Sequence, residues 1–275
     1  MESVVPAWAA ARSVKGNRFP QAIGHRGYSA SFPENTMAAF RGAKIVGAHA
    51  LETDVRLSAD GSMPRLVDLL QYLVELAVER AWLLLDIKKE ASPKDLLAAI
   101  ARAIASVPCT KRPWNERIIL GPWDTECVGA CLRLLPGFPV ALIAFSPDYA
   151  SAMLSVPNLN FNVFSRTFAT ARGNRFVKEA KKLQRLTFSW TDNEDEWMAF
   201  SIQNGIDGVI TDDPKRFLEV CEQWTSDDVR KAASGFRVKQ LILYFIINIL
   251  IRLAETVAWL KDGSPEFRVK RAVEK

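Results

Sequence analysis

The chain has 275 residues, of which 49% are hydrophobic, and carries a formal net charge of +5. That length and apolar content are enough for one large α/β domain with a sizeable core, or for two small ones. Ten Lys/Arg and four Asp/Glu follow residue 228, so this tail carries +6 and the rest carries −1. The imbalance argues against a general nucleic-acid surface and for a tail that meets an anionic partner.

Short apolar segments alternate with amphipathic segments over residues 20–224. The predicted strands are 22–24, 50–55, 82–87, 117–120, 140–144, 160–164, 186–190 and 208–210, and the predicted helices are 36–43, 66–79, 94–105, 126–134, 147–154, 177–183, 195–204 and 214–224. This alternation predicts parallel strands joined by crossover helices. Eight repeats favour a closed (β/α)8 TIM barrel. A doubly wound open sheet is the alternative, and the lack of G-x-G-x-x-G after the first strand argues against dinucleotide binding.

Polar residues follow most of these strands, at the ends where a TIM barrel places its active site. They are His25, Arg26, Glu52, Asp54, Asp86, Lys88, Trp123, Asp124, Trp190, Asp192, Asp212 and Asp213. A single acid at such a position is commonly a helix N-cap. We interpret Asp212-Asp213-Pro214 in this way, because proline suits the first helical position.

Two carboxylates, Glu52 and Asp54, are two residues apart on a predicted strand and therefore share one face. Two carboxyl groups this close together rarely ionise at the same time unless a cation lies between them. Asp86 ends the next strand and can supply a third carboxylate. Hard oxygen ligands of this kind predict a divalent metal site for Mg²⁺ or Ca²⁺.

His25 is the histidine best placed for proton transfer near neutral pH. Arg26 offers a planar fork of donors for phosphate oxygens, and Lys88 adds a point charge. Together with a metal, these groups fit a site that binds phosphoryl oxygens better than a site for acyl transfer. The sequence also contains no G-x-S-x-G, the motif of a serine nucleophile in acyl transfer. A hydrogen-bonded structural role is the alternative for His25. His49 is expected to be structural, because alternation turns it away from Glu52 and Asp54.

Cysteine spacing and the N-terminus bear on the compartment. Cys109, Cys127, Cys131 and Cys221 show no pattern of a disulfide framework or zinc site. No basic segment followed by an apolar run starts the sequence, so no signal peptide is expected. These features favour an intracellular protein that is not secreted.

The tail contains an apolar run over 241–251, within a predicted hydrophobic or amphipathic helix at 237–260 and before a basic tail at 261–275. At 1.5 Å per residue the run spans roughly 16 Å, about half of a bilayer core. The flanking cations favour an interfacial helix or tail anchor on an anionic membrane surface. The alternative is an extra helix packed on the barrel.

Several segments together resemble one known family. They are Ile23-Gly24-His25-Arg26-Gly27, Pro33-Glu34-Asn35-Thr36 with Phe40, Gly47-Ala48, Leu51-Glu52-Thr53-Asp54-Val55, Asp60-Gly61, Leu85-Asp86-Ile87-Lys88, Ser189-Trp190-Thr191 and 205–214. Over roughly residues 20–220 the chain is similar to the glycerophosphodiester phosphodiesterase (GDPD) family. Leu85-Asp86-Ile87-Lys88, Glu116-Arg117-Ile118, Gly121, Trp123 and the apolar tail look most like the fungal phosphatidylglycerol phospholipase C branch.

The resemblance implies a TIM barrel with a divalent metal. It implies that His25 is a catalytic acid/base and that Arg26 contacts phosphate. The metal ligands would be Glu52, Asp54 and Asp86, while Lys88 and Trp190 would face the substrate. The implied reaction is phospholipase C-type cleavage of phosphatidylglycerol to diacylglycerol and glycerol phosphate. A substrate hydroxyl can attack first, giving a cyclic phosphate that water opens.

The chain departs from the family after Asp60-Gly61. In the family an apolar run ending in His-Asp follows, and then a variable segment, whereas here Ser62 leads directly to Met63 and Pro64. The second catalytic histidine is therefore missing, and no histidine follows His49. Losing a general acid or base costs roughly 10²–10⁴ in rate.

Two explanations of this gap near 61–63 stay open: an exon omitted from the sequence, or a true deletion. Retention of the other site residues favours the first. A true deletion would leave a catalytically impaired barrel that binds phosphoglycerol headgroups or a partner. A different metal-assisted barrel enzyme, such as an enolase-like one, is disfavoured by the block from His25 to Asp54.

Overall fold

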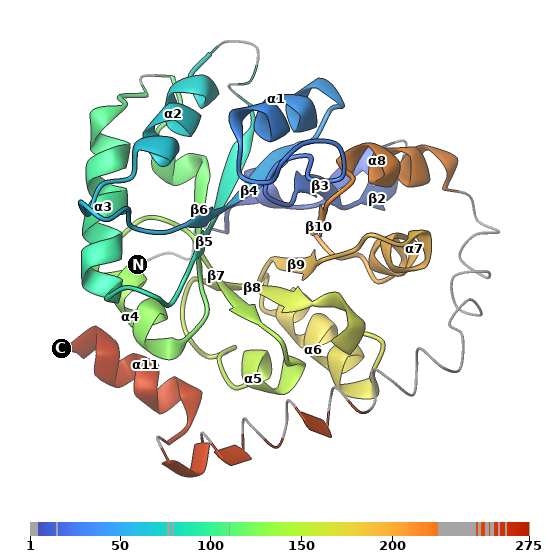
Figure 1. Cartoon of the computed structure of the whole chain (residues 1–275). Coiled ribbons are helices and arrows are strands. Elements are labelled where there is room, and N and C mark those ends of the chain that lie inside the picture. The colour runs from blue at the N-terminus through green and yellow to red at the C-terminus, as the bar shows by residue number, and fades with distance from the viewer. Residues whose placement is uncertain are drawn as a thin grey trace.

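The computed structural model describes residues 5–14, 16–75, 78, 80–109, 111–224, 246, 249–250, 253, 256–257, 259–261 and 263–274. Its main sheet is a closed barrel of parallel strands in the order β10-β3-β4-β5-β6-β7-β8-β9. Helices surround this barrel on the outside (Figure 1). The predicted (β/α)8 TIM barrel is therefore confirmed.

Every predicted strand and helix of residues 20–224 is present, and most have shifted ends. The barrel strands are β3 (Gln21–Gly24), β4 (Ala50–Val55), β5 (Trp82–Ile87), β6 (Ile118–Pro122), β7 (Val140–Ala144), β8 (Leu159–Phe164), β9 (Thr187–Trp190) and β10 (Gly208–Thr211). The helices between and after them are α1 (Met37–Ile45), α2 (Pro64–Leu73), α3 (Pro93–Ser106), α4 (Thr125–Leu134), α5 (Pro147–Ser151), α6 (Ala171–Lys182), α7 (Asp195–Gln203) and α8 (Pro214–Gln223).

Strand β5 shows how the sequence builds the barrel layers. Every residue of this strand is buried, as expected for a parallel strand covered on both faces. Trp82 and Leu84 pack with the cluster inside the barrel, whereas Leu83 and Leu85 pack with the cluster beneath the helices. Asp86 continues the inward column, so alternation carries an apolar interior into a polar C-terminal end.

The N-terminal segment fills the opposite end of the barrel, which the sequence did not predict. A 3₁₀ turn, η1 (Ala7–Ala9), precedes a hairpin of β1 (Arg12–Val14) and β2 (Asn17–Phe19). The rings of Trp8 and Trp82 lie 5.6 Å apart, edge to face. Gln21 donates to the carbonyl of Trp8 and accepts from the indole of Trp82, each at 2.8 Å. These contacts seal the end of the barrel that lies away from the predicted site.

Helix α6 begins six residues earlier than predicted. Thr170 caps it by accepting a hydrogen bond from the amide of Gly173. Glycine lowers helix propensity, but here a Cβ on Gly173 would lie 2.3 Å from the carbonyl oxygen of Thr167. The glycine thus permits close packing of the helix on the preceding turn. Helices α2 and α5 end earlier than predicted, at Leu73 and Ser151.

The tail contains a helix that was predicted only as a basic segment. Helix α11 (Pro265–Glu274) packs against α4 (Figure 1). In the predicted 237–260 helix, the described residues 246, 249–250, 253, 256–257 and 259–260 are helical, and the others lie outside the described part of the chain. Among the described helices, none has both the length and the apolar character needed to cross a bilayer.

His49, predicted to be structural, lies just before β4 and links it to β3. Its Nδ1 accepts a hydrogen bond from the amide of Ala22 at 2.9 Å. Burial, reinforced by the cations of Arg12 and Lys44, lowers the pKa of His49 to about 3. The folded protein therefore holds this imidazole in its neutral form.

We expect His49 to make stability fall in acid. Below its ordinary pKa the unfolded chain binds a proton that the folded chain excludes until about pH 3. The free energy of unfolding should therefore fall from about pH 6.5 downward, by up to ~1.4 kcal/mol per pH unit from this group. In His49→Gln, the amide oxygen can still accept from Ala22 but does not titrate. Urea unfolding at several pH values should show a shallower slope, and equal slopes would contradict the assignment.

Candidate active site

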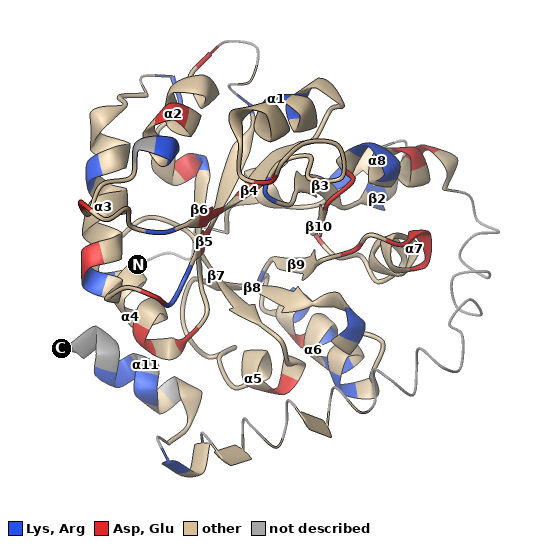
Figure 2. Ribbon diagram, in the orientation of Figure 1, with Lys and Arg blue, Asp and Glu red and all other residues tan. Residues whose placement is uncertain are grey.

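The C-terminal end of the barrel gathers the predicted site residues. Three carboxylates from β4 and β5, Glu52, Asp54 and Asp86, each offer an oxygen within 4.8 Å of the others. We call them the carboxylate cluster. Asp54 and Asp86 are directly paired across the two strands, and acidic segments lie near the barrel axis in Figure 2. The strand register, more than any loop, brings these groups together.

The carboxylate cluster has the chemistry of an oxygen-ligand metal site. Burial, followed by the charges of Asp86 and Asp54, raises the pKa of Glu52 to about 7 despite nearby His25. Burial also raises the pKa of Asp86. The Oε1 atom of Glu52 is buried and has no hydrogen-bond partner among the described residues. A divalent cation would satisfy this oxygen and relieve the repulsion, so the residues fit Mg²⁺ or Ca²⁺.

Lys88 joins the carboxylate cluster directly. Its Nζ lies 2.8 Å from Asp54 Oδ1 and 2.6 Å from Asp86 Oδ2. Burial acts to raise the pKa of Asp54, but the contacts with Lys88 outweigh it and the net shift is downward. The sequence placed Lys88 toward the substrate, and the structure places its cation between two of the three acids.

His25 is paired with an aspartate from the last strand. Its Nδ1 lies 2.6 Å from Oδ1 of Asp212, which also accepts from the hydroxyl of Ser29 at 3.0 Å and, through Oδ2, from the amide of Asn193 at 2.6 Å. The other ring nitrogen, Nε2, lies 4.0 Å from Glu52 Oε2. Since a carboxylate only accepts, Nδ1 carries the proton of the neutral ring, and Nε2 presents its lone pair toward the cluster.

The pairing corrects the sequence interpretation of Asp212-Asp213. Asp213 alone caps α8, accepting from the amide of Arg216 at 2.9 Å. Asp212 instead orients His25. Burial lowers the pKa of His25, but the hydrogen bond to Asp212 and the charge of Glu52 outweigh it and the net shift is upward. Two adjacent acids at a strand end were the available signal, since one helix needs only one cap.

Arg26 links the histidine segment to the cluster. Its amide donates to Glu52 Oε2 at 2.8 Å, and its guanidinium lies 2.7 Å from Glu34 and 3.3 Å from Asp54. Its φ is +54°, an uncommon left-handed conformation that typically occurs where the surroundings enforce it. Gly27 follows at φ +88°, where a Cβ would lie 2.6 Å from the backbone of Ala39. This tight turn aims the Arg26 amide at the metal-ligand candidate.

Four aromatic side chains line the other half of the barrel mouth. We call Trp123, Phe145, Phe164 and Trp190 the aromatic wall, and neighbouring ring centroids within it lie 5.0–6.0 Å apart. Trp123 donates its indole N–H to Asp86 at 2.6 Å, and Phe145 is 47% exposed. The sequence singled out Trp190 as a substrate contact, but missed the two phenylalanines: Phe145 follows β7 and Phe164 ends β8, neither within any motif.

The connection from β4 to α2 is short and leaves open space beside the cluster. A cavity of about 540 Å³ is lined by Arg26, Asp54 and residues of the 55–66 segment. This is where the sequence predicted missing residues. No histidine other than His25 and His49 is present in the chain, so the site holds one imidazole.

Three comparisons place the chain among known proteins. The profile of the "Glycerophosphoryl diester phosphodiesterase family" matches residues 25–64 and 68–216. A protein from Caldanaerobacter subterraneus subsp. tengcongensis described as "Glycerophosphodiester phosphodiesterase" is 24% identical over 242 residues, covering 72% of this chain and 96% of that protein.

Solved structures share the fold. A glycerophosphoryl diester phosphodiesterase described as putative, from Silicibacter pomeroyi, superposes with a TM-score of 0.67 at 20% identity, covering 80% of this chain and 98% of that one. An Oleispira antarctica phosphodiesterase in complex with the product sn-glycerol-3-phosphate superposes with a TM-score of 0.59 at 19% identity, covering 74% and 98%. These structures show the shared fold. The profile match, which covers more than half of the chain, shows that the chain belongs to the glycerophosphoryl diester phosphodiesterase family, whose members are phosphoric diester hydrolases.

Proposed function

We propose that the chain hydrolyses glycerophosphodiesters with a divalent metal, and that its substrate is phosphatidylglycerol, cleaved to diacylglycerol and glycerol phosphate. The observation that carries the proposal is the carboxylate cluster with the Nε2 atom of His25 only 4.0 Å from Glu52. The product sn-glycerol-3-phosphate bound to the Oleispira antarctica phosphodiesterase supports a glycerol phosphate product here.

The residues of the site divide the chemistry among them. A divalent cation held by Glu52, Asp54 and Asp86 would draw charge from a phosphoryl oxygen. His25, fixed by Asp212, takes the proton of an attacking substrate hydroxyl at Nε2 and returns it to the leaving oxygen. Water attack on the resulting cyclic phosphate reuses the same atom. Arg26 is positioned to donate to phosphate oxygens from the edge of the cluster.

The aromatic wall supports a lipid substrate over a fully polar one. The polar half of the mouth suits the phosphate and glycerol, while the exposed face of Phe145 offers apolar area beside the leaving group. Burying such a ring stabilises a complex by roughly 1.5–3 kcal/mol. We further propose that the protein works inside the cell, attached to a membrane as a peripheral or tail-anchored protein through its C-terminal segment.

A second function follows from the single histidine. A barrel that binds phosphoglycerol headgroups or a partner without turnover needs the cluster and Arg26, but no second acid/base. The 540 Å³ opening beside Asp54, where the short β4–α2 connection runs, favours this alternative. Release of glycerol phosphate in a turnover assay separates the two.

Removing one carboxylate should abolish metal binding. Glu52→Ala takes a buried ligand from the cluster, and the affinity for Mg²⁺ or Ca²⁺ should fall at least about 100-fold. Isothermal titration calorimetry measures this directly. Glu222→Gln, which removes an exposed carboxylate from α8, is the matched control and should bind metal normally. Unchanged affinity in Glu52→Ala would refute the ligand assignment.

Asp212 should act through His25. Asp212→Asn can donate to Nδ1 and so favour the wrong tautomer, and kcat should fall roughly 10²–10⁴-fold. KM and metal affinity should stay unchanged, because Asp212 contacts neither the substrate nor the metal. The control is Asp213→Asn, which keeps a good N-cap for α8 and should retain kcat. Equal kcat values for the two variants would show that Asp212 has no positioning role.

The lipid substrate is tested by comparing two diesters. We expect turnover of phosphatidylglycerol in vesicles and of its deacylated form. Phe145→Ala should lower kcat/KM about tenfold for the lipid alone, because the deacylated diester has no acyl chains to contact the ring. Leu183→Ala, at an exposed apolar residue after α6, is the control. Failure of the wild-type chain to release glycerol phosphate from phosphatidylglycerol would exclude this substrate.

A further inference from the structure

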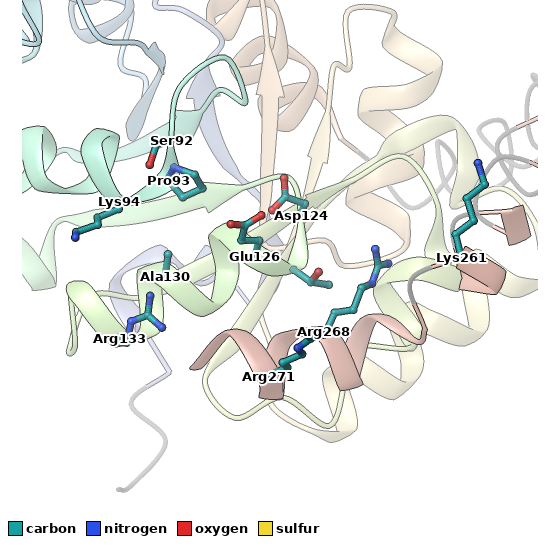
Figure 3. Close-up of a pocket in the computed structure, with 11 residues that line it drawn as sticks. Ser92, Pro93, Lys94, Asp124, Glu126, Ala130, Arg133, Lys261, Arg268 and Arg271 are labelled. Atoms are coloured by element: carbon teal, nitrogen blue, oxygen red, sulfur yellow. The ribbon is translucent and has the colours of Figure 1, made fainter. Parts of the chain in front are cut away.

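A second cavity lies outside the active site, between the barrel and the C-terminal helix. It measures about 710 Å³ and is bordered by the first turns of α3 and α4 and by α11 (Figure 3). We call it the α4–α11 cavity. Its lining shares no residue with the carboxylate cluster, the aromatic wall or the His25–Asp212 pair. It also depends on α11, which lies beyond the family match.

Cations dominate the lining of this cavity. Five of the lining residues, Lys94, Arg133, Lys261, Arg268 and Arg271, are cationic, and two, Asp124 and Glu126, are acidic. Asp124 is already engaged, since it caps α4 through the amide of Cys127 at 2.8 Å and lies 3.5 Å from Lys89. Figure 3 shows Arg268 reaching from α11 toward the first turn of α4. The excess positive charge selects an anionic ligand.

The first turn of α3 strengthens this selection. Ser92 precedes the helix and makes no side-chain capping bond to it, and Ser92, Pro93 and Lys94 line the cavity. The positive end of the helix dipole therefore adds to the five cations. Planar guanidinium forks from α11 on the other side suit the oxygens of a phosphate group.

The cavity opens at the same end of the barrel as the active site. Asp124 lines it and directly follows Trp123, whose indole donates to Asp86 of the carboxylate cluster. Lys89, beside Lys88, pairs with the same Asp124. The border of the α4–α11 cavity at Asp124 therefore adjoins the rim of the active-site mouth.

An exposed apolar row leads into the cavity. The described residues Ile246, Leu250, Leu253, Val257 and Leu260 are each helical. They recur in the sequence at steps of four and three, a spacing typical of one face of an amphipathic helix. Their side chains are 49–83% exposed, and the next residue after Leu260 is Lys261 of the cavity. Phe267 of α11 is 60% exposed as well. An apolar face flanked by cations is the pattern of a helix lying in a membrane interface.

We propose that the α4–α11 cavity binds the phosphate group of an anionic phospholipid headgroup while the apolar row enters the same membrane surface. The occupant is lipid because a soluble phosphate would leave the apolar row exposed to water. This inference rests on the membrane attachment in the proposed function and gives it a defined site. Docking through this cavity turns the barrel mouth, with its aromatic wall, toward the bilayer that contains the substrate.

Vesicle co-sedimentation of the full chain tests the proposal. Phosphatidylcholine vesicles should bind weakly, and vesicles that also contain phosphatidylserine should bind tightly and in a salt-sensitive way. Arg268→Ala with Arg271→Ala, and separately Lys94→Ala from the opposite wall, should weaken binding roughly fivefold for each cation removed. The matched control, Lys178→Ala with Lys182→Ala, removes two exposed cations from α6 and should bind as the wild type does. Equal binding of all variants would overturn the proposal.

Additional variants and a phosphate titration separate the effect of charge, the docking of the tail and the source of the ligand. Arg268→Lys with Arg271→Lys retains the charge and should recover most of the binding, and Lys94→Ala leaves α11 intact, so its effect does not depend on docking of the tail. Calorimetry with inorganic phosphate addresses the source of the ligand. If free phosphate binds the cavity as tightly as the vesicles do, the lipid assignment is wrong.

Hydrolysis of deacylated phosphatidylglycerol is the separate readout for catalysis, and it should be the same in the cavity variants and the wild type. Vesicle binding through these cations in a chain without this activity would support the docking site and refute the proposed function. The reverse result, with hydrolysis retained and vesicle binding absent, would refute the docking site alone.

Discussion

Crowding of three carboxylates at one end of the barrel is the constraint around which the rest of the site is arranged. Strand alternation forces Glu52 and Asp54 onto the same inner face, and pairing of β4 with β5 sets Asp86 beside Asp54. Burial makes their charge costly, so the pKa of Glu52 rises to about 7. The cluster therefore needs cations, and Lys88 supplies one from within the chain.

The hydrogen-bond donors around the carboxylate cluster also stabilise its negative charge. The Arg26 amide and the Trp123 indole each donate to one acid, Glu52 and Asp86 respectively. The hydrogen bond from the Arg26 amide to Glu52 is made with a left-handed φ at Arg26, which is an unfavourable backbone conformation. Because β3 and β6 flank the two acidic strands in the barrel, the donors come from the adjacent strand ends. A rigid scaffold thus holds the oxygen ligands with little freedom to relax, which favours preorganisation for a divalent ion.

How far the sequence predicts this molecule depends on the range of the contacts. Alternation of strands and helices predicted the barrel, and the two-residue spacing of Glu52 and Asp54 predicted their shared face. Asp212 was misassigned because its partner His25 is 187 residues away, and the local pattern fits a cap equally well. Trp8 and Gln21 seal the barrel through contacts with Trp82 that no local periodicity encodes.

The mouth of the barrel joins two chemistries that a glycerophospholipid also joins. On one side lie His25, Arg26 and the carboxylate cluster, and on the other lies the aromatic wall, connected to the cluster through Trp123. Beyond Trp123 the chain continues through Asp124 into the cationic α4–α11 cavity. The polar half of the mouth, the aromatic wall and the cationic cavity therefore lie next to one another around the rim. With one histidine for proton transfer, such a barrel depends more on holding its substrate in place, since positioning supplies much of the barrier reduction in phosphoryl transfer.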